Sequence, residues 1–182
     1  NKNNKAILNS RIKTKTSAHY NRYGGSINKD KKLFKEDIIW SITHVKMLFE
    51  QKIIPFIIKI KIIYGLNKIE KDILNKKFEF IKEFEDIHMN IEKRLTQMID
   101  DDAGYIHTAR SRNDQVITDL KIWMKSATQN IDLNLKRLIK TNLKIAEKNI
   151  KTIMSGFTHL KHAPALSLGH YLMSYVEMFS RD

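Results

Sequence analysis

The chain has 182 residues, of which 42% are hydrophobic and 29% charged, and this composition allows a globular domain with a sizeable core. The absence of cysteine excludes disulfides, thiolate metal sites and a cysteine nucleophile. The formal net charge of +13 fits a nucleic-acid or membrane-surface binder, or a composition simply rich in lysine, isoleucine and asparagine. The second interpretation is favoured, because the basic residues are dispersed over several predicted helices and form no basic cluster.

The first predicted element is an extended, irregular arm over residues 1–30, with a turn at Gly24-Gly25. A stripe of apolar residues at helical spacing then predicts a helix over 37–51. These two features place an extended arm before the first packed helix.

Residues 53–63 are strongly apolar but far shorter than the ~20 residues that a membrane span needs, so they predict a buried helix. Pro55 is suited to the first turn of that helix, and Gly65 is predicted to interrupt or end it. A separate helix is predicted over 67–75.

The next helix is predicted over 84–100 and is ended by the acidic run and glycine of residues 100–104. A very long helix is predicted over 113–152, where apolar residues recur close to a heptad spacing; its length would be roughly 60 Å. Gly156 is predicted to break the pattern, and Pro164 to begin a last helix over 164–182.

These elements predict an all-α fold class with two domains. Residues 1–106 form a small helical N-terminal domain with its extended arm, and residues 107–182 form the start of a central helical bundle. The apolar seam of the long helix cannot be buried within one small domain, so the bundle is expected to be completed by further chain or by other subunits.

The most informative segment is the run of nine polar, small or cationic residues from His107 to Gln115, at the start of the long helix. A helix start presents free backbone N–H groups and a partial positive charge, and the run adds two guanidinium groups. This combination predicts a site for a carboxylate or phosphate. A purely structural alternative is a capping box of Ser111 with Asp114, and both interpretations can hold together.

This run resembles the signature of the argininosuccinate lyase family, within the fumarase/aspartase superfamily. A second block, Met154 to Leu160, resembles that family's Met-Pro-Gly-Tyr-Thr-His-Leu, and further matches run from near Leu8 to the last residue. They include Ser26-Ile27, Asp30, Glu85 to His88, Gly169-His170 and Tyr175 to Met178. The chain departs from the family pattern at Leu8 to Ile12, where only Arg11 matches, and at Trp40, Ser155, Lys161, Pro164 and Ala165.

The resemblance implies elimination of argininosuccinate to arginine and fumarate in arginine biosynthesis, by a cytoplasmic homotetramer whose active sites are shared between subunits. It implies a small-molecule substrate, no metal, no cofactor, no nucleic acid and no membrane. His159 is the implied catalytic acid–base residue, and a histidine titrates in the range that such a role needs. The implied substrate-binding residues are Ser26, Arg112, Asn113 and Thr158, and the implied supporting residues are Ser111 and His88.

The residues alone leave simpler interpretations open. His159 after a glycine turn is typical of a helix-start hydrogen bonder, and Ser26 after two glycines is typical of a turn. His88 with Glu92 one turn later could bind a metal, although a hydrogen bond or ion pair is favoured. A metal site at His159 and His162 is disfavoured, because no further ligands are evident.

The family's Gly-Ser-Ser loop, which carries the serine base, and its Met-Pro-Gln-Lys-Lys-Asn block are not among these 182 residues. The chain is therefore expected to be an incomplete part of a lyase that cannot turn over substrate alone. One alternative is a non-catalytic remnant or structural relative of the family, which the changes at Trp40, Lys161 and Pro164 favour. Another is a basic helical module that binds nucleic acid.

Overall fold

The computed structural model describes residues 23–182, apart from the side chain of Glu83. These residues belong to two compact units, which divide in sequence between Trp123 and Met124. Arg11 and the greater part of the predicted N-terminal arm lie outside the described residues. The predicted domain boundary at residue 106 stays a prediction.

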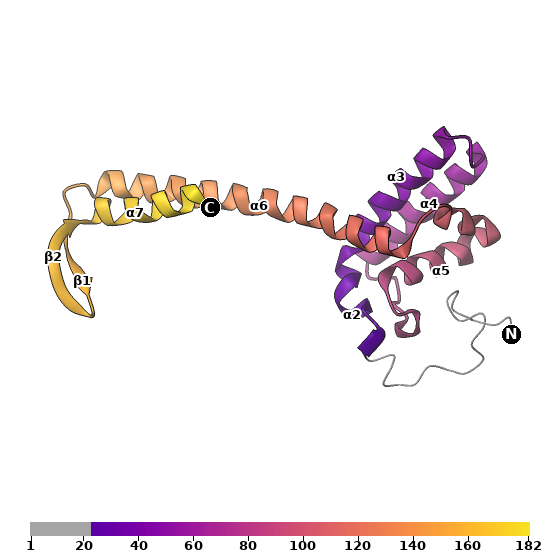
Figure 1. Cartoon of the computed structure of the whole chain (residues 1–182), viewed down its shortest axis with the longest axis horizontal. Helices are drawn as coiled ribbons and strands as arrows, with labels where there is room; N and C mark the ends of the chain where they lie inside the picture. The colour runs from indigo at the N-terminus through magenta and orange to yellow at the C-terminus, as the bar shows by residue number, and fades with distance from the viewer. Residues whose placement is uncertain (1–22) are drawn as a thin grey trace. The chain divides into compact units, whose positions relative to one another are not determined.

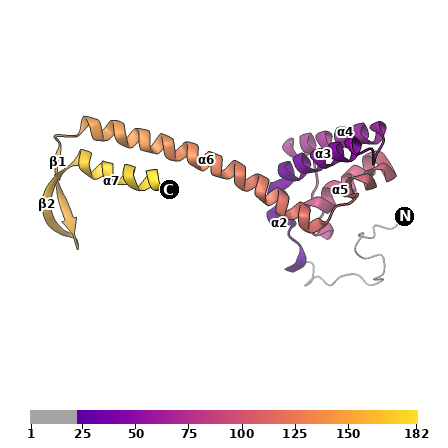
Figure 2. The same cartoon turned by 45° about the horizontal axis from the view of Figure 1, so that its top comes forward.

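The first unit is built from helices. After α2 (Ile27–Asp30) and the 3₁₀ turn η2 (Lys31–Leu33) come α3 (Phe34–Glu50), α4 (Phe56–Leu74), η3 (Lys82–Phe84), α5 (Ile87–Ile99) and η4 (Asp100–His107). Figures 1 and 2 show α3, α4 and α5 packed side by side. Their inward faces form one apolar core of buried residues, among them Val45, Leu48, Ile62, Leu66, Ile69, Ile87 and Leu95.

Helix α4 runs without a break from Phe56 to Leu74, so the predicted interruption at Gly65 and the separate helix over 67–75 were wrong. Gly65 is buried, and a Cβ atom added to it would overlap Leu95 Cδ1 of α5. The glycine is therefore a point of close helix approach rather than a helix end, and packing outweighs its poor helix propensity.

Helix α6 (Arg112–Lys148) has 37 residues and contributes to both units. It begins within one residue of the predicted start and ends four residues before the predicted end. Several residues of its predicted apolar seam are exposed, among them Ile117, Leu120, Met124, Ile131 and Leu138. The exposure is what the sequence predicts for a bundle helix whose neighbours are not part of this chain.

The second unit contains a two-stranded antiparallel hairpin, which the sequence analysis did not predict. Strand β1 (Ile153–Thr158) pairs with β2 (Lys161–Ser167), and helix α7 (Leu168–Arg181) follows. In Figures 1 and 2, α7 runs back along the last turns of α6. The all-α fold class is confirmed, with this hairpin as the exception among residues 23–182.

The predicted helix start at Pro164 was wrong, because this residue lies in β2. The strands pair Ser155 with Ala165 and Gly156 with Ala163, which leaves Pro164 as the extra residue of a β-bulge. A proline lacks the N–H that a regular ladder position would need, and a bulge is one of the few places where a strand tolerates it.

Candidate functional site

The polar run lies where the sequence predicts it, between η4 and the first turn of α6. Ser111 and Asn113 are exposed, and the Ser111 Oγ accepts a hydrogen bond of 3.2 Å from the backbone N–H of Asn113. Ser111 thus caps the helix start, although its partner is Asn113 rather than the predicted Asp114. The cap holds the Ser111 hydroxyl beside the positive end of a 37-residue helix, and the Asn113 side chain is exposed in the first turn of that helix.

Arg112 is held by three carboxyl and amide groups. Its Nη1 and Nη2 atoms each lie 3.2 Å from one oxygen of Glu92 in α5, which makes a two-pronged ion pair. Nη1 also donates to the Oε1 of Gln115 at 2.8 Å, and Nε lies 3.7 Å from Asp86. The guanidinium is therefore fixed in orientation and is partly exposed, with the Nε–H and one Nη2 hydrogen left outside these hydrogen bonds.

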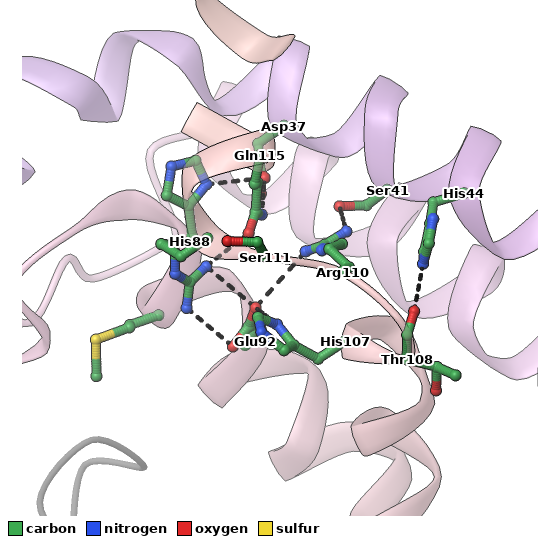
Figure 3. Close-up of polar contacts among 12 residues, drawn as sticks. Asp37, Ser41, His44, His88, Glu92, His107, Thr108, Arg110, Ser111 and Gln115 are labelled. Atoms are coloured by element: carbon green, nitrogen blue, oxygen red, sulfur yellow. Dashed lines mark hydrogen bonds and ion pairs between the residues drawn. The ribbon is translucent and has the colours of Figure 1, made fainter. Parts of the chain in front are cut away.

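A buried group of polar residues lies beneath Arg112. The Nδ1 of His88 lies 2.9 Å from Asp37 Oδ1 and 3.5 Å from Asp119 Oδ2, and Gln115 Nε2 donates to Asp37. All four side chains are almost inaccessible to solvent. Figure 3 shows Asp37, His88 and Gln115 meeting at one point. His88 thus makes a hydrogen bond, as expected, but to Asp37 rather than to Glu92 on its own helix.

Burial and charge set the protonation of this group. Burial alone would raise the pKa of Asp37, but the hydrogen bonds from His88 and Gln115 and the nearby positive charges lower it below its ordinary value. Burial alone would lower the pKa of His88, but Asp37 and the other carboxyl groups raise it. Burial and the negative charge of Asp37 raise the pKa of Asp119 to about 8. Asp119 therefore carries a proton at neutral pH, while Asp37 is a carboxylate that accepts from His88.

Three of these side chains, Asp37, His88 and Asp119, form the one group of possible metal ligands among the described residues, with donor atoms within 4.8 Å of one another. The positive charge of Arg110 acts on both carboxyl groups and opposes a second cation there. The hydrogen bond between His88 and Asp37 already uses one of the two histidine nitrogens that could bind a metal. The geometry therefore favours a hydrogen-bonded cluster.

Trp40, one of the departures from the family pattern, packs against the guanidinium of Arg110 and the imidazole of His44. The guanidinium carbon of the buried Arg110 lies 4.4 Å from the centre of the Trp40 ring, and the His44 ring stacks on Trp40 at 5.4 Å. Arg110 also donates to Ser41 at 3.1 Å and lies 3.6 Å from Glu92 (Figure 3). Trp40 thus supports the guanidinium of Arg110, which lies beside Glu92, the ion-pair partner of Arg112.

Ser26 occupies the N-cap position of the short α2 without a side-chain capping hydrogen bond, and it is exposed. Its backbone N–H donates to the carbonyl of Glu85 at 2.7 Å, and its Oγ donates to Asp30. Burial raises the pKa of that Asp30 carboxyl above its ordinary value. The contact with Glu85 anchors Ser26 to the segment just before α5, which also carries Asp86.

Thr158 and His159 lie in the second unit, at the closed end of the β1–β2 hairpin. Thr158 ends β1, and the next two residues adopt left-handed backbone conformations, with φ of 49° at His159 and 62° at Leu160. The side chains of this turn are exposed. An open cavity of about 610 Å³ lies along the hairpin, with Thr158, Pro164 and His170 among its lining residues. His162 does not stand free beside this turn, because its Nδ1 lies within hydrogen-bond distance of the Ser155 hydroxyl, at 3.0 Å.

The structure groups the predicted site residues by compact unit. Ser26, His88, Ser111, Arg112 and Asn113 belong to the first unit, and Thr158 and His159 belong to the second. The supporting roles of Asp37 and Asp119 had no counterpart among the sequence-based predictions. Glu92, Arg110 and Gln115 lay in patterns that the sequence singled out, but their roles in holding Arg112 and Asp37 were not predicted. A weak signal for some of them is present, since Gln115 and Asp119 lie four residues apart on one helix face.

A family model described as lyase matches residues 10–182. The chain belongs to the lyase family. It is 68% identical over 182 residues to an argininosuccinate lyase of Pelagibacter ubique and 48% identical over 172 residues to one of Ehrlichia ruminantium. These matches cover 100% and 94% of the chain, but only 39% and 37% of the two relatives.

Among solved structures, an EDDS lyase in complex with formate superposes with a TM-score of 0.72, at 24% identity over 84% of this chain and 29% of that one. The fold of the described residues is thus that of this group of lyases, and the resemblance to argininosuccinate lyases is confirmed. None of the described helices has the length and apolar composition that a membrane crossing would require.

Proposed function

We propose that the chain forms part of an argininosuccinate lyase, which splits argininosuccinate into arginine and fumarate by elimination. The observation that carries this proposal is the 68% identity to the Pelagibacter ubique argininosuccinate lyase along the whole chain. Because the chain spans only 39% of that relative, the activity is proposed for the complete assembly to which the chain contributes.

In this proposal the start of α6 binds a carboxylate of the substrate. Asn113 offers an exposed amide beside the helix end, and Arg112 offers the guanidinium hydrogens that Glu92 and Gln115 leave available. Ser111 supports both by capping the helix, and Ser26 adds a hydroxyl from α2. A carboxylate next to the carbon that loses its proton must be stabilised as negative charge develops, which is what such donors provide.

His159 is proposed to act as the acid–base residue, with Thr158 as its substrate-binding neighbour. The hairpin presents His159 on an exposed turn, where its imidazole is available to a substrate held by another part of the assembly. Elimination needs a proton removed from carbon and a proton given to the departing guanidine, and an imidazole can exchange protons near neutral pH.

The complete protein is proposed to be a homotetramer with active sites shared between subunits. One observation supports this proposal. The α6 part of the second unit exposes large apolar side chains, including Ile131, Leu133, Leu138, Leu143 and Ile145. Exposed apolar side chains in such number are typical of an interaction face.

The experiment that tests the activity is a chimera, in which this chain replaces the matching 39% of the Pelagibacter ubique argininosuccinate lyase. Argininosuccinate is added and fumarate release is followed by ultraviolet absorbance. The chimera is expected to release fumarate, the isolated chain is expected to release none, and His159→Asn is expected to reduce the rate by at least about a hundredfold. A chimera that assembles like its parent but releases no fumarate contradicts the proposal.

A non-catalytic relative is the second candidate, and the changes at Lys161 and Pro164 in β2 favour it, because they adjoin the Thr158-His159 turn. It predicts that the assembled chimera is inactive and that Lys161→Gln with Pro164→Gln restores fumarate release. An active chimera with no gain from the two substitutions rejects this candidate.

A further inference from the structure

Gln115 is a fully buried amide that joins two charged side chains. Its Oε1 accepts a hydrogen bond of 2.8 Å from Arg112 Nη1, and its Nε2 donates to Asp37 Oδ1. Arg112 lies three residues before Gln115 on α6, whereas Asp37 comes from α3. The amide therefore connects the exposed start of α6 to the buried interior of the first unit.

The chemistry of the two partners leaves the amide one orientation. A guanidinium can only donate hydrogen bonds, and an ionised carboxylate can only accept them. A glutamine amide satisfies both at once, through two different atoms and without a charge of its own. Reversing the amide would set Nε2 against a donor and Oε1 against an acceptor, and both contacts would be lost in a site closed to water.

Asp37 is itself held in place by a third helix. His88 of α5 contacts the same Asp37 Oδ1 at 2.9 Å, and Asp37 belongs to the first turn of α3. The charged and titratable groups around the amide are Asp37 from α3, His88 and Glu92 from α5, Arg112 and Asp119 from α6, and Arg110 before it. The position of Gln115 is thus defined by groups from three helices.

We propose that Gln115 is a positioning residue, which transmits the fixed location of Asp37 to the guanidinium of Arg112 and so orients it toward a substrate carboxylate. The part concerning substrate rests on the proposed function, whereas the part concerning orientation does not. Glu92 fixes the plane of the guanidinium through its two oxygens, and Gln115 fixes the guanidinium from the side of α6. Only the two contacts together define which hydrogens of Arg112 remain available.

The first test measures the orientation of Arg112 directly, in the 182-residue chain. Gln115→Met keeps the length and volume of the side chain but removes both hydrogen bonds. NMR of the arginine side chains is expected to show that rotation of the Arg112 guanidinium becomes about tenfold faster or more. The matched control is Gln97→Met, because Gln97 accepts from Arg94 at the same spacing of three residues but on an exposed surface. Gln97→Met should leave the rotation rate of the Arg112 guanidinium unchanged. If Gln115→Met also leaves that rate unchanged, the proposal is overturned.

A second variant keeps the test decisive should Gln115→Met fail to fold. Gln115→Glu introduces a carboxyl that, when protonated, can donate its O–H to Asp37 and accept from Arg112, as the amide does. The introduced carboxyl is expected to hold its proton well above the ordinary range of a glutamic acid, because ionisation would set it against Asp37. Titration followed by NMR measures this in the same chain. A carboxyl that titrates as an ordinary glutamic acid shows that position 115 does not bridge Arg112 and Asp37.

The effect on substrate is measured in the chimera. Gln115→Met is expected to raise KM for argininosuccinate about tenfold and to lower kcat as well, because a misplaced Arg112 weakens both the binding of the substrate carboxylate and the stabilisation of the negative charge that develops there. Gln115→Glu should behave like the unaltered chimera at acid pH and lose affinity as its carboxyl ionises. If rotation of the Arg112 guanidinium becomes faster but KM is unchanged, the substrate role is rejected. If the unaltered chimera is inactive, the proposed function is rejected, whereas the NMR result on the orientation of Arg112 still stands.

Discussion

Gly169 allows the start of α7 to lie against the end of α6, and its replacement by alanine is expected to destabilise the second unit. A Cβ atom at this position would lie 2.9 Å from the carbonyl oxygen of Ala146 and 3.2 Å from Cα of Ile150. Both are backbone atoms, so α7 must move away, which weakens the 3.2 Å hydrogen bond from Gly169 N–H to Asn149. Overpacking of this kind costs about 1–3 kcal/mol, against a gain of at most about 1 kcal/mol from helix propensity.

The net expectation for Gly169→Ala is a loss of about 1–2 kcal/mol in the free energy of unfolding, measured by urea denaturation with far-ultraviolet circular dichroism. The matched control is Gly104→Ala. A Cβ atom added to Gly104 meets no heavy atom within 4 Å, and its backbone is not left-handed. That substitution should be neutral or stabilise by up to about 1 kcal/mol, because alanine restricts the unfolded chain. Equal effects at the two glycines, or a gain at Gly169, would refute the reasoning.

Two further predictions concern the first unit. Asp119→Asn should make stability less dependent on pH: the pKa of about 8 lies above the ordinary 3.8, so the stability that the protonated group supports is complete below pH 4 and is lost toward pH 8. In that interval, the free energy of unfolding of the native chain should therefore fall relative to that of the variant by up to about 1.4 kcal/mol per pH unit. Parallel curves of urea midpoint against pH for the two proteins would contradict this. Asp86→Ala should cost about 1 kcal/mol, because Asp86 Oδ1 caps α5 by accepting from Met89 N–H at 2.7 Å. Asp86→Asn serves as the control, because asparagine can still cap the helix. If thermal unfolding shows that Asp86→Asn loses as much stability as Asp86→Ala, the capping role is contradicted.

The helices of the first unit could be predicted because their apolar residues recur at helical spacing. That periodicity places α3 and α5 within a few residues of their observed ends. Gly65 could not be interpreted in the same way, since a glycine that ends a helix and one that allows close packing look alike in sequence. Only the position of Leu95, thirty residues further along the chain, distinguishes them.

The hairpin of the second unit was missed for a related reason. Pro164 is usually informative because it begins helices and is rare in strands. Here it occupies a bulge opposite Ser155 and Gly156, and a bulge is defined only by the pairing of two segments. The start of α6 could be predicted, because a polar run followed by a long apolar repeat is a local signal that needs no partner.

The buried polar cluster could not be predicted, because its partners lie far apart in the sequence. Asp37 and His88 are separated by 51 residues, and Asp37 and Gln115 by 78.

The cluster also explains why an amide suits position 115. Arg112 already faces the carboxylate of Glu92, so an ionised carboxyl at 115 would set a second negative charge against both the guanidinium and Asp37. A neutral amide orients the guanidinium without adding that charge, while the proton on Asp119 and the hydrogen bond from His88 keep Asp37 the single ionised acceptor beneath it. The arrangement thus separates two tasks, because the buried groups fix the geometry and Arg112 retains the charge.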